Sequence, residues 1–452
     1  MEELNIATNK YLLPLVSFII NLGFGMISPI MIYYLMALDK MLTTLPEELG
    51  TIENAGAVAF EYTLMMASFM LTRALLARYF GDLSDRIGRK KIILFGLLGY
   101  TILSYLYILA QNWIHLLIIR AIQGVSSAMV WPVAEALLID SVPQEERGRW
   151  MGIYISSMFA SFIAGPALGV ASYKYAAYVL NYDVLNALKF PFYILTLMSL
   201  ASFLLSFILR ETISLKKKKI DIEKMKRARM EILNKLPPKI KKAVNVLYIM
   251  GFANGIAMGF VAPIMNIFIT QYITADPTVL GIIASISGGL GIAVSYSAGR
   301  ISDKVGRKKM VISGQLISRT MTMITPLIKD VDELLIVVSL RVAAFNISSP
   351  AYRALQGDLV PKQIRGRVFG TVQTLFNFGA ALSPLGGYIY QLLSKDTIYL
   401  ISIQVPAVAV LFWMSALIGF ITVMLFALYV PEPNDEERRI IESLERSFIS
   451  PR

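Results

Sequence analysis

The chain has 452 residues, of which 56% are hydrophobic and 16% are charged, and its formal net charge is +12. Soluble domains average about 45–50% apolar and about 25% charged residues, so this composition excludes an ordinary soluble protein. The absence of cysteine excludes disulfide frameworks and thiolate chemistry, and the single histidine, His115, excludes most zinc sites and histidine-based triads. We therefore predict no metal, no cofactor and no enzymatic activity.

Twelve predominantly apolar stretches are long enough to cross a bilayer, which needs about 20 helical residues. In chain order they cover residues 11–38, 56–80, 92–110, 113–139, 150–173, 190–209, 243–270, 278–299, 310–328, 333–357, 367–393 and 403–429. We predict an all-α integral membrane protein with a bundle at 1–210, a basic loop at 211–242, a second bundle at 243–430 and a tail at 431–452.

The positions of lysine and arginine predict the orientation. If the amino terminus is cytoplasmic, only five of the 43 basic residues fall in external loops. These five are Lys40, Lys174, Lys189, Lys329 and Lys395. Because basic residues accumulate in cytoplasmic loops, both termini are expected on the cytoplasmic side of the cell membrane. The net charge thus records topology and does not indicate a nucleic-acid partner. The basic loop is either a helix on anionic lipid or a solvated tether.

The two halves of the chain repeat at an offset of 218 residues. Residues 81–91 (GDLSDRIGRKK) return as residues 299–309 (GRISDKVGRKK). The same offset relates Asp140 to Asp358 and Pro166 to Pro384. Six spans followed by six in the same orientation form a parallel repeat, which places a substrate site near the midplane between two bundles.

The repeated loop resembles the signature of the major facilitator superfamily, and the resemblance extends over nearly the whole chain. It implies two pseudo-symmetric six-helix bundles and a gating role for the loop residues and their charged partners. These are Gly81, Asp85, Arg86, Gly88, Arg89, Asp140, Gly299, Asp303, Lys304, Gly306, Arg307 and Asp358. The family likeness further implies that Asp85 lies against the helix start near 367–370 and Asp303 against that near 149–152, latching the cytoplasmic side. Small glycines allow such close approach.

Two further stretches resemble motifs of proton-coupled members. Arg120, followed by Gln123-Gly124, resembles a motif in which the arginine takes part in proton transfer; the alternative is an arginine that extends to the external interface. Gly165, Pro166 and Gly169 resemble the antiporter motif of drug:proton exchangers, with a proline kink and glycines that let the two halves pack closely.

Charged residues within spans are costly in lipid and are therefore candidates for proton coupling. At the repeat offset the counterpart of Glu135 is Arg353, and we predict that this pair bridges the halves in the outward-facing state. The competing partner of Glu135 is Arg73, in its own half. Glu61 is predicted to pair with Arg120.

Seven polar or aromatic residues on spans one, four, seven and ten are candidates for the substrate cavity. They are Asn21, Tyr34, Trp131, Asn254, Asn266, Asn346 and Tyr352. An aromatic cavity with few fixed charges suits lipophilic or amphiphilic solutes. The sequence thus favours a monomeric exporter driven by protons. The alternatives are an importer of a sugar or organic acid and, more remotely, a membrane receptor or lipid-handling protein.

Overall fold

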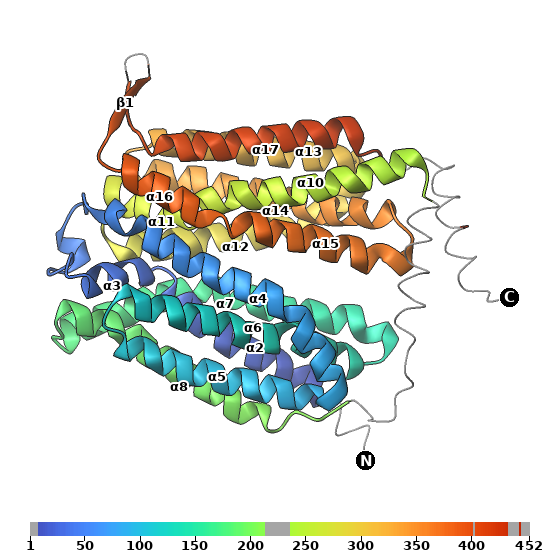
Figure 1. The fold of residues 1–452 in the computed structure, drawn as a ribbon, viewed down its shortest axis with the longest axis horizontal. Coiled ribbons are helices and arrows are strands. Elements are labelled where there is room, and N and C mark those ends of the chain that lie inside the picture. Colours follow the sequence, from blue (N-terminus) through green and yellow to red (C-terminus); the bar gives the residue numbers. More distant parts are fainter. Residues whose placement is uncertain (1–7, 213–235, 401–402, 433–442, 444–452) are drawn as a thin grey trace.

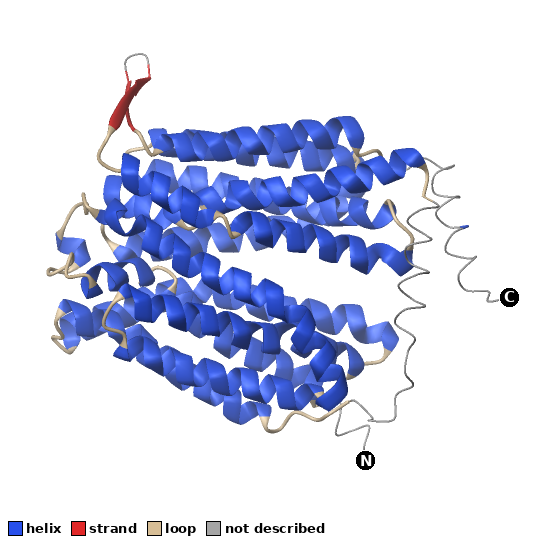
Figure 2. Ribbon diagram, viewed as in Figure 1, coloured by secondary structure: helices blue, strands red, loops and turns tan. Residues whose placement is uncertain are grey.

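The computed structural model describes residues 8–212, 236–400, 403–432 and 443. Its helices form two bundles that lie side by side with their long axes roughly parallel, the first in blue and green and the second in yellow to red (Figure 1). Nearly all of the regular structure is helical (Figure 2). We call the end with the α4–α5 and α12–α13 loops the motif end, and the opposite end the closed end.

The first bundle contains seven α-helices, because the first predicted span is broken at Pro29. They are α2 (Asn9–Ile27), α3 (Met31–Leu38), α4 (Ala59–Ile87), α5 (Arg89–Leu109), α6 (Trp113–Asp140), α7 (Arg147–Lys174) and α8 (Val184–Ser206). Short helical turns are η1 (Pro46–Glu48), η2 (Ala55–Val58), η3 (Gln144–Glu146) and η4 (Tyr175–Val179). The helix thus breaks where proline removes a backbone donor.

The second bundle repeats this order with two breaks. Its helices are α10 (Pro238–Val261), α11 (Ile264–Tyr272), α12 (Pro277–Val305), α13 (Arg307–Ile324), α14 (Val331–Asp358), α15 (Lys362–Ala380), α16 (Ser383–Leu393) and α17 (Ala409–Tyr429), with η5 at Thr325–Leu327. An antiparallel hairpin of β1 (Thr397–Leu400) and β2 (Ile403–Pro406) precedes α17. The sequence patterns did not predict this hairpin, which lies at the closed end. The predicted span 403–429 is corrected at its start, because Ile403–Pro406 form β2 and the helix begins at Ala409.

Ten helical segments among the described residues are long and apolar enough to cross a membrane. Helices α13 and α15–α16 occupy the ninth and eleventh predicted spans but are not among these ten. The all-α membrane fold is therefore confirmed, and the count of twelve spans stays a prediction. Polar residues explain why α13 differs, since it carries Gln315 and Arg319 inside the bundle.

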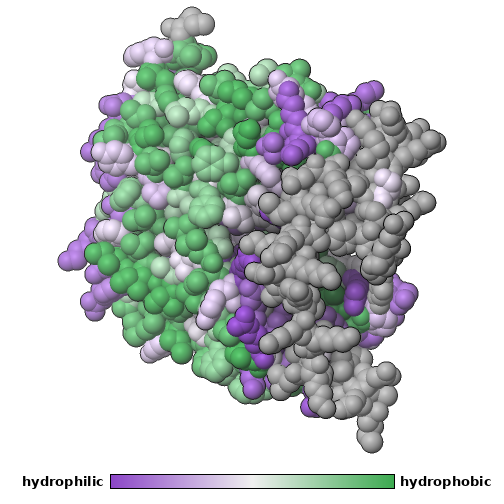
Figure 3. Space-filling view, turned by 45° about the vertical axis from the view of Figure 1, so that its right-hand side comes forward, coloured by the Kyte–Doolittle hydropathy of each residue, from purple (hydrophilic) through white to green (hydrophobic). Residues whose placement is uncertain are grey.

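The outer faces of the bundles are apolar, as lipid contact requires. Large side chains such as Phe95, Leu197, Ile336 and Leu428 are between 59% and 66% exposed. In Figure 3 hydrophobic residues cover most of the part of this face that the grey atoms leave visible, and hydrophilic residues gather toward its ends. Such a surface is suited to contact with the acyl chains of a bilayer.

Three clusters of buried apolar side chains show how the halves are joined. The largest contains residues of both halves, among them Tyr33 and Leu188 from the first and Phe268 and Phe412 from the second. The other two clusters lie toward the motif end, and each belongs to one half alone. The molecule therefore has a continuous core at the closed end and two separate cores at the motif end.

Candidate functional site

The contacts between the halves come mainly from α7 with α12 and from α4 with α16, toward the closed end. Ser285 in α12 donates a hydrogen bond to the carbonyl oxygen of Ile163 in α7 (2.6 Å), and Gln391 in α16 donates to Ala57 (2.6 Å). Lys174 forms an ion pair with Asp276 at 3.6 Å. A side chain at Gly387 would clash with Thr63, so α16 and α4 are in direct contact there.

Toward the motif end the facing helices lie apart. An added Cβ at Gly81 in α4, Gly152 in α7 or Gly370 in α15 would meet no atom within 4 Å. The sequence analysis placed Asp85 against the start of α15 and gave Gly81 a role in close packing. In this conformation Asp85 instead pairs with Arg89 of its own half at 3.2 Å. The Asp85 contact of the predicted latch is therefore not formed among the described residues, and the two halves lie apart at this end.

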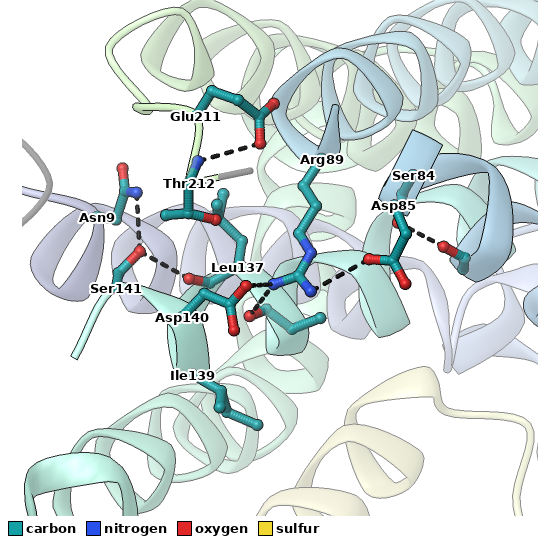
Figure 4. Close-up of polar contacts among 12 residues, drawn as sticks. Asn9, Ser84, Asp85, Arg89, Leu137, Ile139, Asp140, Ser141, Glu211 and Thr212 are labelled. Carbon is teal, nitrogen blue, oxygen red and sulfur yellow. Dashed lines mark hydrogen bonds and ion pairs between the residues drawn. The ribbon is translucent and has the colours of Figure 1, made fainter. Parts of the chain in front are cut away.

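The charged network of the first half centres on Arg89, whose side chain is 11% exposed (Figure 4). Its guanidinium donates to the Asp140 carboxylate (2.6 Å), to the carbonyl oxygen of Ala136 (2.6 Å) and to Asp85 (3.2 Å). Such charge-assisted hydrogen bonds are about twice as strong as neutral ones. Arg89 thus ties the α4–α5 loop to the end of α6, whereas Arg86 is exposed.

The second half repeats this arrangement. Arg307 pairs with Asp358, as Arg89 pairs with Asp140. Gly88 and Gly306 adopt φ values of +108° and +101°, which glycine reaches without the steric cost of a side chain. The side chains of Asp303 and Lys304, and the surroundings of Gly299, lie outside the described residues.

A carboxylate caps the helix that follows each loop, which the sequence analysis did not predict. Glu211, after α8, accepts a hydrogen bond from the backbone N–H of Lys90 at 3.0 Å. Glu432, after α17, accepts one from the backbone N–H of Lys308 at 2.6 Å. Negative charge at a helix amino terminus is stabilising. The signal was present in the sequence as one glutamate just past the last span of each half.

Asn9 is a second residue that sequence reasoning missed. It is fully buried, donates to the Ser141 hydroxyl and to the Arg210 carbonyl oxygen (both 2.9 Å), and accepts from the Arg210 backbone N–H at 2.8 Å. It therefore fastens the start of α2 to the ends of α6 and α8, as part of the polar cluster in Figure 4. A single asparagine before an apolar stretch carries no pattern that indicates such a contact.

Arg120 is buried in α6 and is held by neutral groups. It donates to the Gln123 side-chain oxygen at 3.1 Å and lies over the ring of Tyr107 at 5.7 Å. Tyr107 donates to the same Gln123 oxygen at 3.0 Å. The predicted Glu61–Arg120 ion pair is not formed in this conformation, where one Glu61 carboxylate oxygen is buried without a partner.

Glu135, Arg73 and Arg353 are all exposed residues on the motif-end portions of α6, α4 and α14. Among the described residues none of them forms an ion pair shorter than 4 Å. The positive charge of Arg73 lies close enough to act on Glu135. With the motif end open, this conformation leaves the predicted Glu135–Arg353 bridge untested.

The antiporter-like residues pack within one half. An added Cβ at Gly165 would lie 2.7 Å from the Gly25 Cα, and one at Gly169 would lie 1.9 Å from the Met26 carbonyl oxygen. The expectation that these glycines join the two halves is therefore corrected: they join α7 to α2. The interface contact comes from Pro166, whose carbonyl oxygen would lie 3.3 Å from a Cβ on Gly281 of α12. Helix α7 runs through Pro166 unbroken.

Several predicted cavity residues instead make contacts within one half. Tyr34 is fully buried at the closed end and donates to the Tyr107 carbonyl oxygen at 2.6 Å. Trp131 donates to the Tyr100 hydroxyl at 3.1 Å, and Asn21 donates to the Ser17 carbonyl oxygen of its own helix at 2.8 Å. These three side chains stabilise the first bundle, because their polar groups already have partners.

The other four cavity candidates are partly exposed. Asn254 accepts hydrogen bonds from Arg319 (2.8 Å) and Thr422 (3.2 Å). Asn266 lies near Tyr62 of the other half. Asn346 donates to the Val342 carbonyl oxygen at 2.9 Å, and Tyr352 packs on Phe426 with ring centroids 5.9 Å apart.

Comparison with known proteins agrees with this architecture. The Major Facilitator Superfamily model matches residues 13–242 and 247–451. An uncharacterized MFS-type transporter of Methanocaldococcus jannaschii is 26% identical over 398 residues, covering 86% of this chain and 93% of the relative. The multidrug resistance protein MdtG of Proteus mirabilis is 27% identical over 84% of this chain and 88% of its own.

The fold also matches a solved transporter. The crystal structure of the human organic anion transporter MFSD10 (TETRAN) aligns with a TM-score of 0.60 at 16% sequence identity, covering 94% of this chain and 99% of that chain. At this identity the likeness concerns the fold. Because the family model spans both halves, and the halves form the two bundles described above, the chain belongs to the Major Facilitator Superfamily and is a multi-pass membrane transporter of small molecules.

Proposed function

We propose that the protein exports lipophilic or amphiphilic small molecules across the cell membrane by alternating access, in exchange for protons. The observation that carries this proposal is that the two halves share a core at the closed end and lie apart at the motif end. A substrate between them is reached from one side only. Rocking of the halves about the interface would close the motif end and open the other.

The motif end is assigned to the cytoplasm in this proposal. The excess of lysine and arginine in the predicted loops at this end supports that orientation, with both termini cytoplasmic. The conformation is then inward-facing, and substrate enters from the cytoplasm or the inner leaflet. We propose a monomer, because each half already packs against the other within one chain.

Efflux of amphiphilic compounds is supported by two observations. MdtG proteins, named for multidrug resistance, are 27% identical to this chain over 75–84% of its length. Arg120 is buried beside Gln123 and Tyr107 and has no carboxylate partner among the described residues. Its position should therefore respond when a nearby carboxylate gains or loses a proton. Glu61 and Glu135 are the carboxylates within the first bundle that could accept the proton.

The test is transport by the full chain in phosphatidylcholine vesicles with an imposed proton gradient. The probes are ethidium as an amphiphilic cation, pyrenebutyrate as an amphiphilic anion and glucose as a hydrophilic nutrient. Antiport predicts that one amphiphile accumulates in acid-loaded vesicles while protons leave, and that Arg120→Gln abolishes this coupling. Lys329→Gln, which removes an exposed charge outside the spans, should leave it unchanged. Accumulation in the direction of proton flow, or transport of glucose alone, would overturn the proposal.

A further inference from the structure

Two arginines inside the second bundle have no acidic partner among the described residues. Arg319 of α13 and Arg341 of α14 are half-buried, and Arg341 lies near enough for its charge to act on Arg319. The sequence contains no aspartate or glutamate at 304–329 or 334–357, where these arginines lie, nor at 243–275, 277–302, 359–395 or 397–431. The second bundle therefore cannot neutralise this pair with a carboxylate from within its own spans.

Arg319 is held in one position by neutral oxygens. Its terminal nitrogen donates to Asn254 at 2.8 Å and to Gln315 at 3.4 Å, while its Nε is buried without a partner. The aliphatic part of the Arg319 side chain packs against Gly419 of α17. A Cβ added to Gly419 would lie 2.2 Å from the Arg319 Cδ, so only glycine leaves room for the arginine. Gln315 is itself fixed by a 2.9 Å hydrogen bond to Ser348. This network orients the guanidinium without cancelling its charge.

Arg341 makes no hydrogen bond or ion pair with a described residue. It lies one helical turn before Phe345 on α14, so both side chains occupy the same side of the helix. The opposite side carries the exposed apolar residues Ile336 and Leu340. Because an intramembrane cation faces the bundle interior or a water-filled space, we assign the apolar side to lipid and the Arg341 side to the interior.

Phe345 provides an aromatic surface beside this cation. Its side chain is 47% exposed although it lies on the interior side of α14. Packing of α14 against α12 occurs at Val342 and Asn346, and against α13 at Ala344 and Ser348. Arg341 and Phe345 lie between these two contact surfaces and are therefore not covered by either neighbouring helix.

Two like charges that are partly removed from water and lack a counter-charge are unfavourable. A bound anion would remove that cost. We propose that Arg319 and Arg341 form a subsite for the carboxylate or sulfonate group of an amphiphilic substrate, with Phe345 against its apolar body. The subsite deepens the proposed function by naming the substrate class, and it rests on the opening between the halves being the transport path.

The experiment compares three probes with the same aromatic body: pyrenebutyrate, pyrenebutanol and pyrenebutylamine. Binding to the full chain in neutral phosphatidylcholine nanodiscs is measured by fluorescence anisotropy without any proton gradient. The wild type should bind the carboxylate more tightly than the alcohol and the amine. Arg341→Gln should weaken carboxylate binding about tenfold or more, as expected for the loss of a charge-assisted hydrogen bond, and leave alcohol binding unchanged.

Three further variants complete the design. Arg319→Gln should act in the same direction, and Arg341→Lys should retain part of the preference because it keeps the charge and loses the planar guanidinium. Lys329→Gln removes one positive charge of the same half on an exposed segment and should have no effect. A thermal unfolding scan of each variant distinguishes lost binding from lost folding.

Equal affinity for the three probes, or an equal loss for carboxylate and alcohol in Arg341→Gln, would overturn the subsite. Competition by chloride or phosphate alone, without any preference among the pyrene probes, would show an inorganic-anion site and would also overturn it. The two proposals can fail separately. Charge-selective binding without transport would support the subsite and overturn the proposed export. Proton-driven transport of ethidium, without preference for the carboxylate probe, would support export and overturn the subsite.

Discussion

The α4–α5 loop and the α12–α13 loop turn on glycines with nearly equal φ, each followed by an arginine that pairs with an aspartate at the end of another helix. Each is capped by a glutamate that follows the last helix of its half. The spans near these loops, however, carry different charges. Glu61 and Glu135 lie in the first half, whereas the second has arginines and no carboxylate at comparable depth.

This difference separates two kinds of requirement. The loops, caps and close helix contacts hold each bundle rigid, and both halves need them because both rock about one interface. Charges inside the membrane are costly and are retained where they bind or exchange something. We therefore interpret the shared features as mechanical and the unshared charges as chemical, with protons handled by the first half and an acidic group by the second.

The largest effect is expected at the close helix contacts that both halves share. A Cβ at Gly169 would lie 1.9 Å from a carbonyl oxygen of α2, and one at Gly255 would lie 2.1 Å from a carbonyl oxygen of α15. Gly169→Ala and Gly255→Ala should each destabilise the protein by at least the 1–3 kcal/mol typical of overpacking, about equally, and abolish transport. Thermal unfolding in detergent measures the stability.

Gly152→Ala is the matched control, because it lies on the same helix as Gly169 and has nothing within 4 Å. Alanine is a better helix former than glycine by about 1 kcal/mol, so this variant should be as stable as the wild type or more so. Unequal losses at Gly169 and Gly255 would break the comparison by showing that the two contacts differ in function.

A second prediction sharpens the comparison at the charged networks. The Arg89 side chain is 11% exposed and that of Arg307 is 32% exposed. Arg89→Ala should lower the free energy of unfolding by about 1–3 kcal/mol, because it removes the hydrogen bonds of a charged side chain and leaves Asp140 to partial solvation. Arg307→Ala should lower the free energy of unfolding by about 1 kcal/mol or less, since Arg307 and its partner Asp358 are both more exposed to water than Arg89 and Asp140. Equal shifts in melting temperature would contradict this ranking.

Sequence patterns predicted the fold and the repeat well, and the interior contacts poorly. The apolar stretches and the 218-residue offset follow from local chemistry that one chain displays. The helix break at Pro29 was not predicted, since the first span was expected to run unbroken over 11–38. The partners of Tyr34, Trp131 and Gly165 do not, because the residues facing them lie far away in the sequence. The glycines of the antiporter-like motif were assigned to the wrong interface for this reason, although their role in close packing was anticipated.

Conformation limited the prediction of the charged site as well. The predicted latch at Asp85 requires a closed motif end, and the sequence does not indicate in which conformation the protein is described. The half-buried pair Arg319 and Arg341 shows a further limit. The sequence shows that the stretches 304–329 and 334–357 around these arginines lack acids, but only the packing shows that the two cations lie near each other.

A third prediction concerns the carboxylate that distinguishes the first half. If Glu135 bridges to Arg353 when the motif end closes, Glu135→Arg and Arg353→Glu should each abolish transport, and combining them should restore a measurable fraction. If Glu135 instead pairs with Arg73, the rescuing combination is Glu135→Arg with Arg73→Glu. Vesicle transport of the same probe distinguishes the two, and rescue by neither pair would remove Glu135 from any ion-pair gate.

The smallest effect is expected at the closed end, where Lys174 of the first half pairs with Asp276 of the second at 3.6 Å. Both side chains are about one-third exposed (34% and 32%), so the pair contributes about 1 kcal/mol or less. Lys174→Met should therefore raise the ratio of molecules separated at this end to molecules joined there by at most about fivefold, without loss of folding. Spin labels on the exposed residues Lys40 and Lys395, placed across this end, would report the shift as a longer distance component. Charge exchange, Lys174→Asp with Asp276→Lys, should return the distribution to that of the wild type, whereas an unchanged distribution in Lys174→Met would show that the apolar core alone holds this end closed.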